Sequence, residues 1–205
     1  MNTPHKFNKD NSYWKFKDKY LEFEKWDGVE VVVSLRGYKK EIKDSLESKA
    51  KLITGKQVHG NKVLIVSEPG EYECDGFITN KSGIYLGVST ADCMPVFIYE
   101  KRNKIISLLH AGRKGTQEGI LHEALCILQQ DFNSDAKDIS ILFGPAICPL
   151  CYEYDLWENN YKQAKDMGVT DIINPEICTA ESLDMFYSYR KERTPERMLS
   201  AICLR

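Results

Sequence analysis

The sequence predicts an α+β fold in which layers of mixed β-sheet are flanked by helices. Short runs rich in β-branched residues outnumber the helical segments, and several of them adjoin through short turns. They do not alternate with helices as the strands of a strictly βαβ protein would. Because the chain has no internal repeat, low-complexity tract or Pro/Ser-rich linker, we expect residues 1–205 to form a single domain.

Strands dominate the expectations for the first half of the chain. Aromatic residues recur within residues 1–28, which predicts an N-terminal arm packed on the body. Residues 41–53 have helix-forming composition and are expected to form a helix. The polar segment 100–104 predicts a hairpin between the strands on either side of it. Strands are expected over residues 28–34, 61–66, 76–79, 84–88, 95–99 and 105–109.

The second half combines helices with strands. Apolar residues recur at helical spacing over residues 116–130, which predicts an amphipathic helix. Another helix is expected from Asp155, with Glu158 completing a capping pair and Gly168 ending the helix. The remaining strands are expected over residues 138–143, 172–174 and 198–203.

Composition limits the classes of partner. The chain has 28 Lys and Arg against 30 Asp and Glu, a net charge of −2, which argues against nucleic acid as the main partner. No run approaches the roughly 20 apolar residues that span a bilayer, and residues 1–19 lack the apolar core of a signal peptide. The seven cysteines are therefore expected to be reduced thiols, and the protein is expected to be cytoplasmic, with no membrane partner.

Two histidines and one cysteine lie where strand-like runs end, and they predict an open metal site. His59, Cys93 and His110 are too far apart in sequence for a local zinc-binding loop, so only a folded sheet could bring them together. Nitrogen and sulfur donors suit zinc or copper, and three protein ligands leave one coordination position free for chemistry. Each residue taken alone is more often a packing residue than a ligand.

The other histidines and the CxxC motif predict no reactive site. His122 is expected on the solvated side of the helix over residues 116–130, and His5 in a frayed arm. Cys148 and Cys151 form a CxxC pair, but no thioredoxin-like βαβ setting surrounds it and no further ligands are near. Packing in a loop is the expected role, ahead of redox chemistry or a second metal site.

An ordered set of motifs resembles the YfiH/YlmD family, also called the multicopper polyphenol oxidase or laccase-domain family. The resemblance spans about residues 29–205. The motifs that carry it are Gln57-Val58-His59-Gly60, Cys74-Asp75-Gly76, Thr90-Ala91-Asp92-Cys93-Met94-Pro95, His110-Ala111-Gly112, Gly144-Pro145-Ala146-Ile147, Cys151-Tyr152-Glu153, Cys178-Thr179 and Phe186-Tyr187-Ser188-Tyr189-Arg190.

This resemblance implies a purine nucleoside enzyme. Members of the family phosphorolyse adenosine, inosine and methylthioadenosine, and many also deaminate adenosine. Their metal ligands correspond to His59, Cys93 and His110, the same residues that the strand ends indicate. The resemblance also implies the family's fold, which is similar to that of a bacterial toxin deamidase with a cysteine–histidine pair.

Further site residues follow from the same motifs. Arg36 lies where the family has Arg-Gly-Gly, and it is expected to contact phosphate or substrate. Arg113 and Lys114 replace the family's Trp-Arg after His-Ala-Gly and are expected to supply positive charge to phosphate. Asp75 and Asp92 are expected to orient a ligand histidine or transfer a proton, with a structural turn residue as the equal alternative for each. The family's usual C-terminal Gly-Arg is here Glu196-Arg197. The sequence therefore keeps the family's metal ligands but departs from its pattern in the residues expected around them.

The leading hypothesis is a zinc-dependent purine nucleoside phosphorylase with adenosine deaminase activity, with copper as the second candidate metal. Its partners would be a purine nucleoside and phosphate, and its state a monomer or a homodimer. An alternative enzyme uses Cys93 as nucleophile and His110 as base in a hydrolase or deamidase. A third hypothesis is a non-catalytic metal-binding protein. Copper-dependent phenol oxidation is weaker, because the four histidines are few for several coppers.

Overall fold

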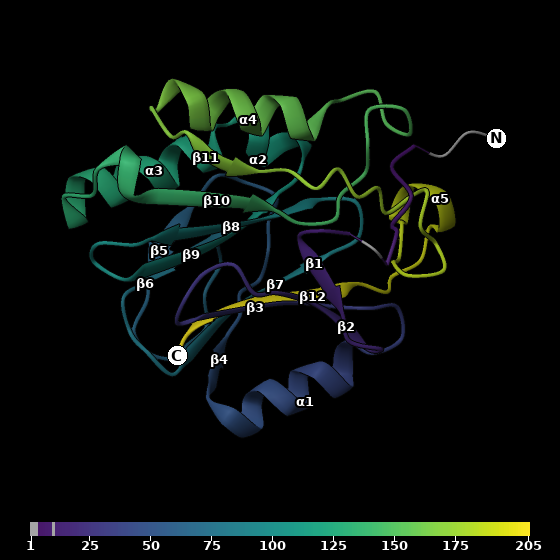
Figure 1. The fold of residues 1–205 in the computed structure, drawn as a ribbon, viewed down its shortest axis with the longest axis horizontal. Helices are drawn as coiled ribbons and strands as arrows, with labels where there is room; N and C mark the ends of the chain where they lie inside the picture. Colours follow the sequence, from purple (N-terminus) through teal and green to yellow (C-terminus); the bar gives the residue numbers. More distant parts are fainter. Residues whose placement is uncertain (1–3, 10) are drawn as a thin grey trace.

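The protein is built from two β-sheets stacked face to face between two layers of helices (Figure 1). The computed structural model describes residues 4–9 and 11–205. Each sheet contains six strands and mixes parallel with antiparallel pairs. The expected class, mixed sheets flanked by helices, is confirmed.

Strands from both ends of the chain form the first sheet. Its neighbours are antiparallel except for β4 and β7, which run parallel. Its strands, in spatial order, are β1 (Trp14–Phe16), β2 (Tyr20–Phe23), β3 (Val29–Ser34), β12 (Met198–Leu204), β7 (Ile84–Thr90) and β4 (Lys51–Ile53).

The middle of the chain forms the second sheet. Its central strands are antiparallel, and both edge strands pair in parallel with their neighbours. The strands, in spatial order, are β11 (Asp171–Ile173), β10 (Ile139–Phe143), β8 (Met94–Glu100), β9 (Ile105–Ala111), β6 (Gly76–Thr79) and β5 (Val63–Ile65). The turn between β8 and β9 is the predicted hairpin.

Three apolar clusters fill the spaces between the four layers. The largest lies between the sheets, where Val31 and Leu86 of the first sheet join Phe97 and Leu108 of the second. The outer face of the second sheet packs against α2 (Arg113–Gln117), α3 (Ile120–Phe132) and α4 (Leu156–Asp166). The outer face of the first sheet is covered by α1 (Lys39–Lys49). All seven residues of β8 are buried, because both faces of the second sheet are covered.

Two predicted helices differ from the structure. The helix expected over residues 41–53 ends at Lys49, because the next residue, Ala50, has an extended backbone, and the three residues after it form β4. Pairing with β7 and the burial of Ile53 override the helix-forming composition there. The helix expected over residues 116–130 is two helices, because Gly119 adopts φ +81° between α2 and α3. The predicted caps of α4 are confirmed: the Asp155 carboxylate accepts a hydrogen bond from the Glu158 N–H at 3.0 Å, and Gly168 follows the helix at φ +82°.

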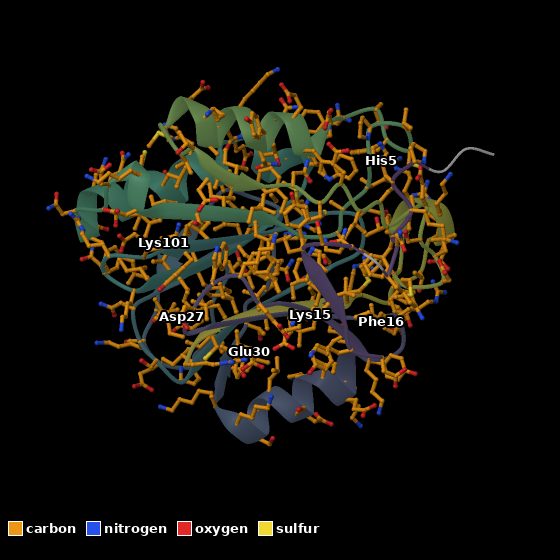
Figure 2. The ribbon with its side chains drawn as sticks, viewed as in Figure 1. His5, Lys15, Phe16, Asp27, Glu30 and Lys101 are labelled. Atoms are coloured by element: carbon orange, nitrogen blue, oxygen red, sulfur yellow. The ribbon has the colours of Figure 1, made fainter. Side chains whose placement is uncertain are left out.

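The N-terminal segment is bound to the body at several points. Trp14 and Phe23 are buried between the sheets, and β1 and β2 extend the first sheet. The expectation that His5 is frayed is wrong, because its carbonyl accepts a hydrogen bond from the Cys178 N–H at 2.8 Å. Its ring also packs edge-on against Trp157, with 5.1 Å between centroids. Figure 2 shows His5 against the body of the molecule, in agreement with these contacts.

The remaining elements are short. A 3-10 turn, Ala136–Asp138, precedes β10, and α5 (Tyr189–Glu192) lies in the segment between β11 and β12. Among the helices of the described residues, none combines the length and the apolar character needed to cross a bilayer.

Candidate metal centre and adjoining cavities

Three segments distant in sequence bring the predicted donors together. His59 comes from the loop between β4 and β5, Cys93 from the turn between β7 and β8, and His110 from β9. One donor atom of each residue lies within 4.8 Å of the other two. The two imidazole rings are nearly perpendicular, at 81°, with 4.8 Å between their centroids. Two nitrogens and one sulfur at this spacing form a set of donors that could hold a metal ion.

Asp75 links the two histidines. Its carboxylate is fully buried, and Oδ1 lies 2.7 Å from Nδ1 of His110. It also accepts hydrogen bonds from the backbone N–H groups of Val58, His59 and Gly60, at 3.1, 3.0 and 2.9 Å. These bonds hold His59 at φ +62°, a conformation that few non-glycine residues adopt. Since Nδ1 of His110 is taken by the carboxylate, Nε2 is left to bind a metal.

Two glycines let the segment after His110, which includes α2, approach Cys93 and the His59 loop closely. A Cβ at Gly112 would lie 2.9 Å from Sγ of Cys93 and 3.5 Å from Cδ2 of His59. A Cβ at Gly115 would lie 2.5 Å from the carbonyl oxygen of Gly60. Both distances leave no room for a side chain, so α2 can pack against the His59 loop only because glycine occupies these positions.

The donor groups perturb one another's protonation in the metal-free protein. Burial would raise the pKa of Cys93, but hydrogen bonds to His110 and His59 outweigh it and lower the pKa to about 6. Burial would lower the pKa of His110, but hydrogen bonds to Asp75 and Cys93 raise it to about 9. The pKa of Asp75 is lowered despite burial, because His110 and the Gly60 N–H bond to its charged form. A thiolate and an imidazolium are therefore expected to coexist near neutral pH.

This pairing predicts the pH dependence of Cys93 alkylation in metal-free protein. A lowered pKa means that the reactive thiolate persists down to about pH 6 and is lost only as the pH falls below that value. The rate of modification by iodoacetamide, followed by peptide mass spectrometry, should be half-maximal near pH 6. In a His110→Ala variant the midpoint should move upward, and bound zinc should protect the thiol. A midpoint near the ordinary thiol value of about 8.5 in wild-type protein would contradict this electrostatic account.

Two cavities meet at Cys93 and Tyr189. The larger, of about 500 Å³, is lined by Gln57, His59, Ser89, Ala91, Cys93, His110, Tyr189 and Arg197. The smaller, of about 200 Å³, is lined by Ala91, Asp92, Cys93, Arg113, Ile147, Tyr152, Leu156, Tyr189, Arg190 and Arg193. A hollow of about 590 Å³ beside Trp26 and Arg205 is larger, but no histidine or cysteine lines it. The two cavities at Cys93 are the candidate site because the metal-binding donors and the arginines line them, although the hollow beside Trp26 has a larger volume.

Asp92 fixes the segment that carries the arginines. Its carboxylate accepts hydrogen bonds from Oγ1 of Thr179 at 2.7 Å and from the backbone N–H of Arg190 at 2.6 Å. The latter bond anchors the start of α5 beside Cys93. Asp75 is the carboxylate that contacts a ligand histidine. The bonds of Asp92 are those of the alternative prediction, a structural turn residue, and its role in proton transfer stays a prediction.

Arg36 also braces α5. Its guanidinium makes two hydrogen bonds to the Glu192 carboxylate, at 2.9 and 2.7 Å, and stacks 4.4 Å above the centroid of the Tyr187 ring. It does not line either cavity of the candidate site. The structure thus does not bring Arg36 to the donors, and its contact with phosphate stays a prediction.

The two predicted cations after Gly112 have different surroundings. Arg113 lines the smaller cavity and lies 3.1 Å from the Glu153 carboxylate. Lys114 is exposed, 3.7 Å from Glu118, and lines neither cavity. Three further arginines, which were not predicted to have a role at the site, line the two cavities: Arg190, Arg193 and Arg197. Arg190 is the last residue of the motif Phe186-Tyr187-Ser188-Tyr189-Arg190, and the other two follow it at intervals of three and four residues, which was the available signal.

The chain is similar in sequence to a known protein family and to named relatives. The family model described as multi-copper polyphenol oxidoreductase laccase matches residues 30–155 and 153–205. Purine nucleoside phosphorylase Cj1217c of Campylobacter jejuni is 31% identical over 172 residues, which are 73% of this chain and 75% of that protein. The purine nucleoside phosphorylase of Aquifex aeolicus is 31% identical over 179 residues, which are 76% of this chain and 84% of that protein.

Solved structures share the fold. YlmD from Geobacillus stearothermophilus superposes with a TM-score of 0.86 at 21% identity, over 94% of this chain and 98% of its own. YfiH from Bacillus licheniformis gives a TM-score of 0.85 at 20% identity, over 94% of this chain and 99% of its own. With the family model matched over nearly the whole chain, this protein belongs to the multi-copper polyphenol oxidoreductase laccase family, the YfiH/YlmD family that its motifs resemble.

Proposed function

We propose that this protein is a zinc-dependent purine nucleoside phosphorylase that acts on adenosine, inosine and S-methyl-5′-thioadenosine and also deaminates adenosine. The observation that carries the proposal is the convergence of His59, Cys93 and His110 beside a cavity lined by arginines. Its curated relatives are named purine nucleoside phosphorylases, which supports an enzyme with nucleoside and phosphate as substrates.

The donor set fits zinc. Zinc accepts imidazole nitrogen and thiolate sulfur together, and three protein ligands are the usual number in catalytic zinc sites. The bond between Asp75 and His110 is the carboxylate–histidine pairing that commonly supports a metal ligand. Zinc held there would supply a Lewis acid that lowers the pKa of a coordinated water to ~7, which is the chemistry that attack on C6 of adenosine requires.

The arginines suit the phosphorolysis. In that reaction a phosphate oxygen forms a bond to C1′ of the ribose while the bond from C1′ to the purine breaks, leaving ribose 1-phosphate and free base. Guanidinium groups match phosphate oxygens in geometry and charge. Arg113, Arg190 and Arg193, which line the smaller cavity, are proposed to bind phosphate, and Tyr189, which lines both cavities, is proposed to stack on the purine. Asp92 is proposed to pass a proton to the departing base.

The test is release of base from nucleoside by zinc-loaded protein. Incubation with inosine and phosphate should yield hypoxanthine and ribose 1-phosphate, and omission of phosphate should stop the reaction. With adenosine, ammonia release should report deamination separately. His110→Ala should abolish both activities, whereas His122→Ala, which alters an exposed histidine outside the cluster, should retain them. No release of base by zinc-loaded wild-type protein would overturn the phosphorylase assignment.

A cysteine-dependent hydrolase is the second candidate, favoured by one observation. Cys93, His110 and Asp75 are ordered as nucleophile, base and orienting carboxylate, and the pKa of Cys93 is lowered to about 6. In that case activity would survive removal of metal by a chelator and would be lost on alkylation of Cys93. Metal bound without turnover of any nucleoside would instead favour a non-catalytic metal-binding protein.

Reduced cysteines support a cytoplasmic location for the enzyme. Its oligomeric state is proposed to be a monomer or a homodimer.

A further inference from the structure

Three cysteines outside the candidate site form a second cluster. One Sγ from each of Cys148, Cys151 and Cys178 lies within 4.8 Å of the other two. Cys148 and Cys178 are fully buried, and Cys151 is partly exposed. The expectation that no further ligand lies near the CxxC pair is wrong, because a distant part of the chain supplies Cys178.

The backbone holds the cysteines in a shape suited to a metal. The N–H groups of Cys151 and Tyr152 both donate to the Cys148 carbonyl, at 3.0 and 3.1 Å, which closes a tight turn around the CxxC pair. The Cys148 N–H donates to Sγ of Cys178 at 3.3 Å. Burial nevertheless raises the pKa of Cys178, so a bound metal would have to displace the proton of this thiol. A parallel bridge between Ala146 and Cys178 fixes the two segments together.

A carboxylate lies beside the three sulfurs, next to Cys148 but outside the 4.8 Å group that the cysteines form. Oε1 of Glu181 lies 3.8 Å from Sγ of Cys148, and its Oε2 accepts a hydrogen bond from the His5 N–H at 2.9 Å. Zinc–sulfur bonds of about 2.3 Å in a tetrahedron place the sulfurs about 3.8 Å apart. The three sulfurs, within 4.8 Å of one another, would have to approach by at most about 1 Å to reach this spacing, and the Glu181 carboxylate would have to turn towards them to bind.

We propose that Cys148, Cys151 and Cys178 bind a structural zinc ion, with Glu181 as the fourth ligand, independently of His59, Cys93 and His110. A metal ion would use all three clustered sulfurs, whereas a disulfide would use only two of them. Four protein ligands leave no position for a substrate, as is typical of structural zinc. Binding would release the protons of the three thiols.

The site would tie three segments together. The CxxC turn follows β10, Cys178 and Glu181 precede α5, and His5 brings in the N-terminal segment. The turn also lies between Ile147 and Tyr152, which both line the smaller cavity. Zinc here would therefore hold one wall of that cavity in place.

The experiment isolates this cluster from the first centre. A His59→Ala/Cys93→Ser background, reduced and metal-free, is titrated with zinc alone without oxygen, and bound metal is measured by elemental analysis. We expect one zinc ion per chain and a higher melting temperature with zinc. Cobalt(II) should give thiolate-to-metal charge-transfer absorption and the intense visible bands of a tetrahedral site. These readouts do not use enzymatic activity, so their failure leaves the proposed phosphorylase untouched.

Variants assign the ligands. In that background, Cys151→Ser should abolish stoichiometric zinc binding and the zinc-dependent rise in melting temperature, with Cys178→Ser as the second thiol variant. Glu181→Gln should weaken binding while the thiolate-to-cobalt absorption persists. Cys126→Ser is the matched control, because Cys126 is partly exposed like Cys151 but lies outside the cluster, and it should bind zinc normally.

Four results would overturn the proposal. A folded background variant that binds no zinc would do so, as would zinc binding that Cys151→Ser leaves unchanged. The third is a Cys148–Cys151 disulfide, found by intact mass and thiol counting, in protein purified under reducing conditions. Binding of cuprous copper without zinc would also reject the zinc assignment, since thiolates suit both ions.

Discussion

Replacement of Asp75 by alanine is expected to lower zinc affinity at the His59–Cys93–His110 centre by about 10- to 100-fold. In metal-free protein it should also lower the free energy of unfolding by about 3–5 kcal/mol. Phosphorolysis should fall with the loss of metal. Isothermal titration with zinc and urea unfolding of the metal-free protein measure the two effects separately.

The size of this effect follows from the number of groups that one carboxylate serves. Its removal leaves the buried His110 without its charged partner and three backbone N–H groups of the His59 loop without an acceptor. Each buried group that loses its partner costs stability, because water cannot replace the lost bond. The positive φ of His59 is also no longer held by Asp75.

An isosteric variant separates shape from charge. Asp75→Asn keeps the side-chain volume and one acceptor oxygen, so it should fold more stably than Asp75→Ala yet still bind zinc less tightly than wild type. If Asp75→Ala binds zinc within twofold of wild type, the carboxylate does not position His110 for a metal.

Gly112→Ala is expected to weaken zinc binding at the same centre by about 10- to 100-fold, while the protein remains folded. The added Cβ would lie 2.9 Å from Sγ of Cys93, so the thiol must move away from the imidazoles. Overpacking of this kind costs about 1–3 kcal/mol, and about 1.4 kcal/mol corresponds to a factor of ten in affinity. The backbone is not the cause, because Gly112 has φ −84°, which alanine adopts readily.

Gly60→Ala is the matched control, one residue from His59. A Cβ there would meet its nearest neighbours at 3.8 Å, an ordinary contact distance, and the backbone N–H that donates to Asp75 is kept. This variant should bind zinc close to wild-type affinity in the same titration. Equal zinc affinity for Gly112→Ala and Gly60→Ala would show that the approach of Gly112 to the thiol has no bearing on the metal.

The features that could be predicted from the sequence are those that depend on a short stretch of neighbouring residues. His59, Cys93 and His110 were predicted as a group because each was expected at the end of a strand, where a sheet can gather side chains. Cys93 does lie between two strands, β7 and β8, but His59 lies in the loop between β4 and β5. His110 itself lies inside β9, which runs on through Ala111. The caps of α4 were predictable because Asp155, Glu158 and Gly168 act through bonds to near neighbours in sequence.

Other features depend on contacts that no local pattern contains. Residues 51–53 became a strand because β7 offered a pairing edge, not because of their own composition. Cys178 joins the CxxC pair only because its segment bridges to Ala146. Arg36 was expected at phosphate, but a carboxylate far along the chain, Glu192, takes its guanidinium.

The place of β12 in the first sheet has a consequence for the order of folding. This strand lies between β3 and β7, so residues near opposite ends of the sequence must meet before the sheet is continuous. Pairings of such high contact order form slowly, since the entropy of closing a long loop is lost before the contacts compensate. Cys93 lies in the short turn between β7 and β8, so this turn is expected to reach its native geometry late in folding.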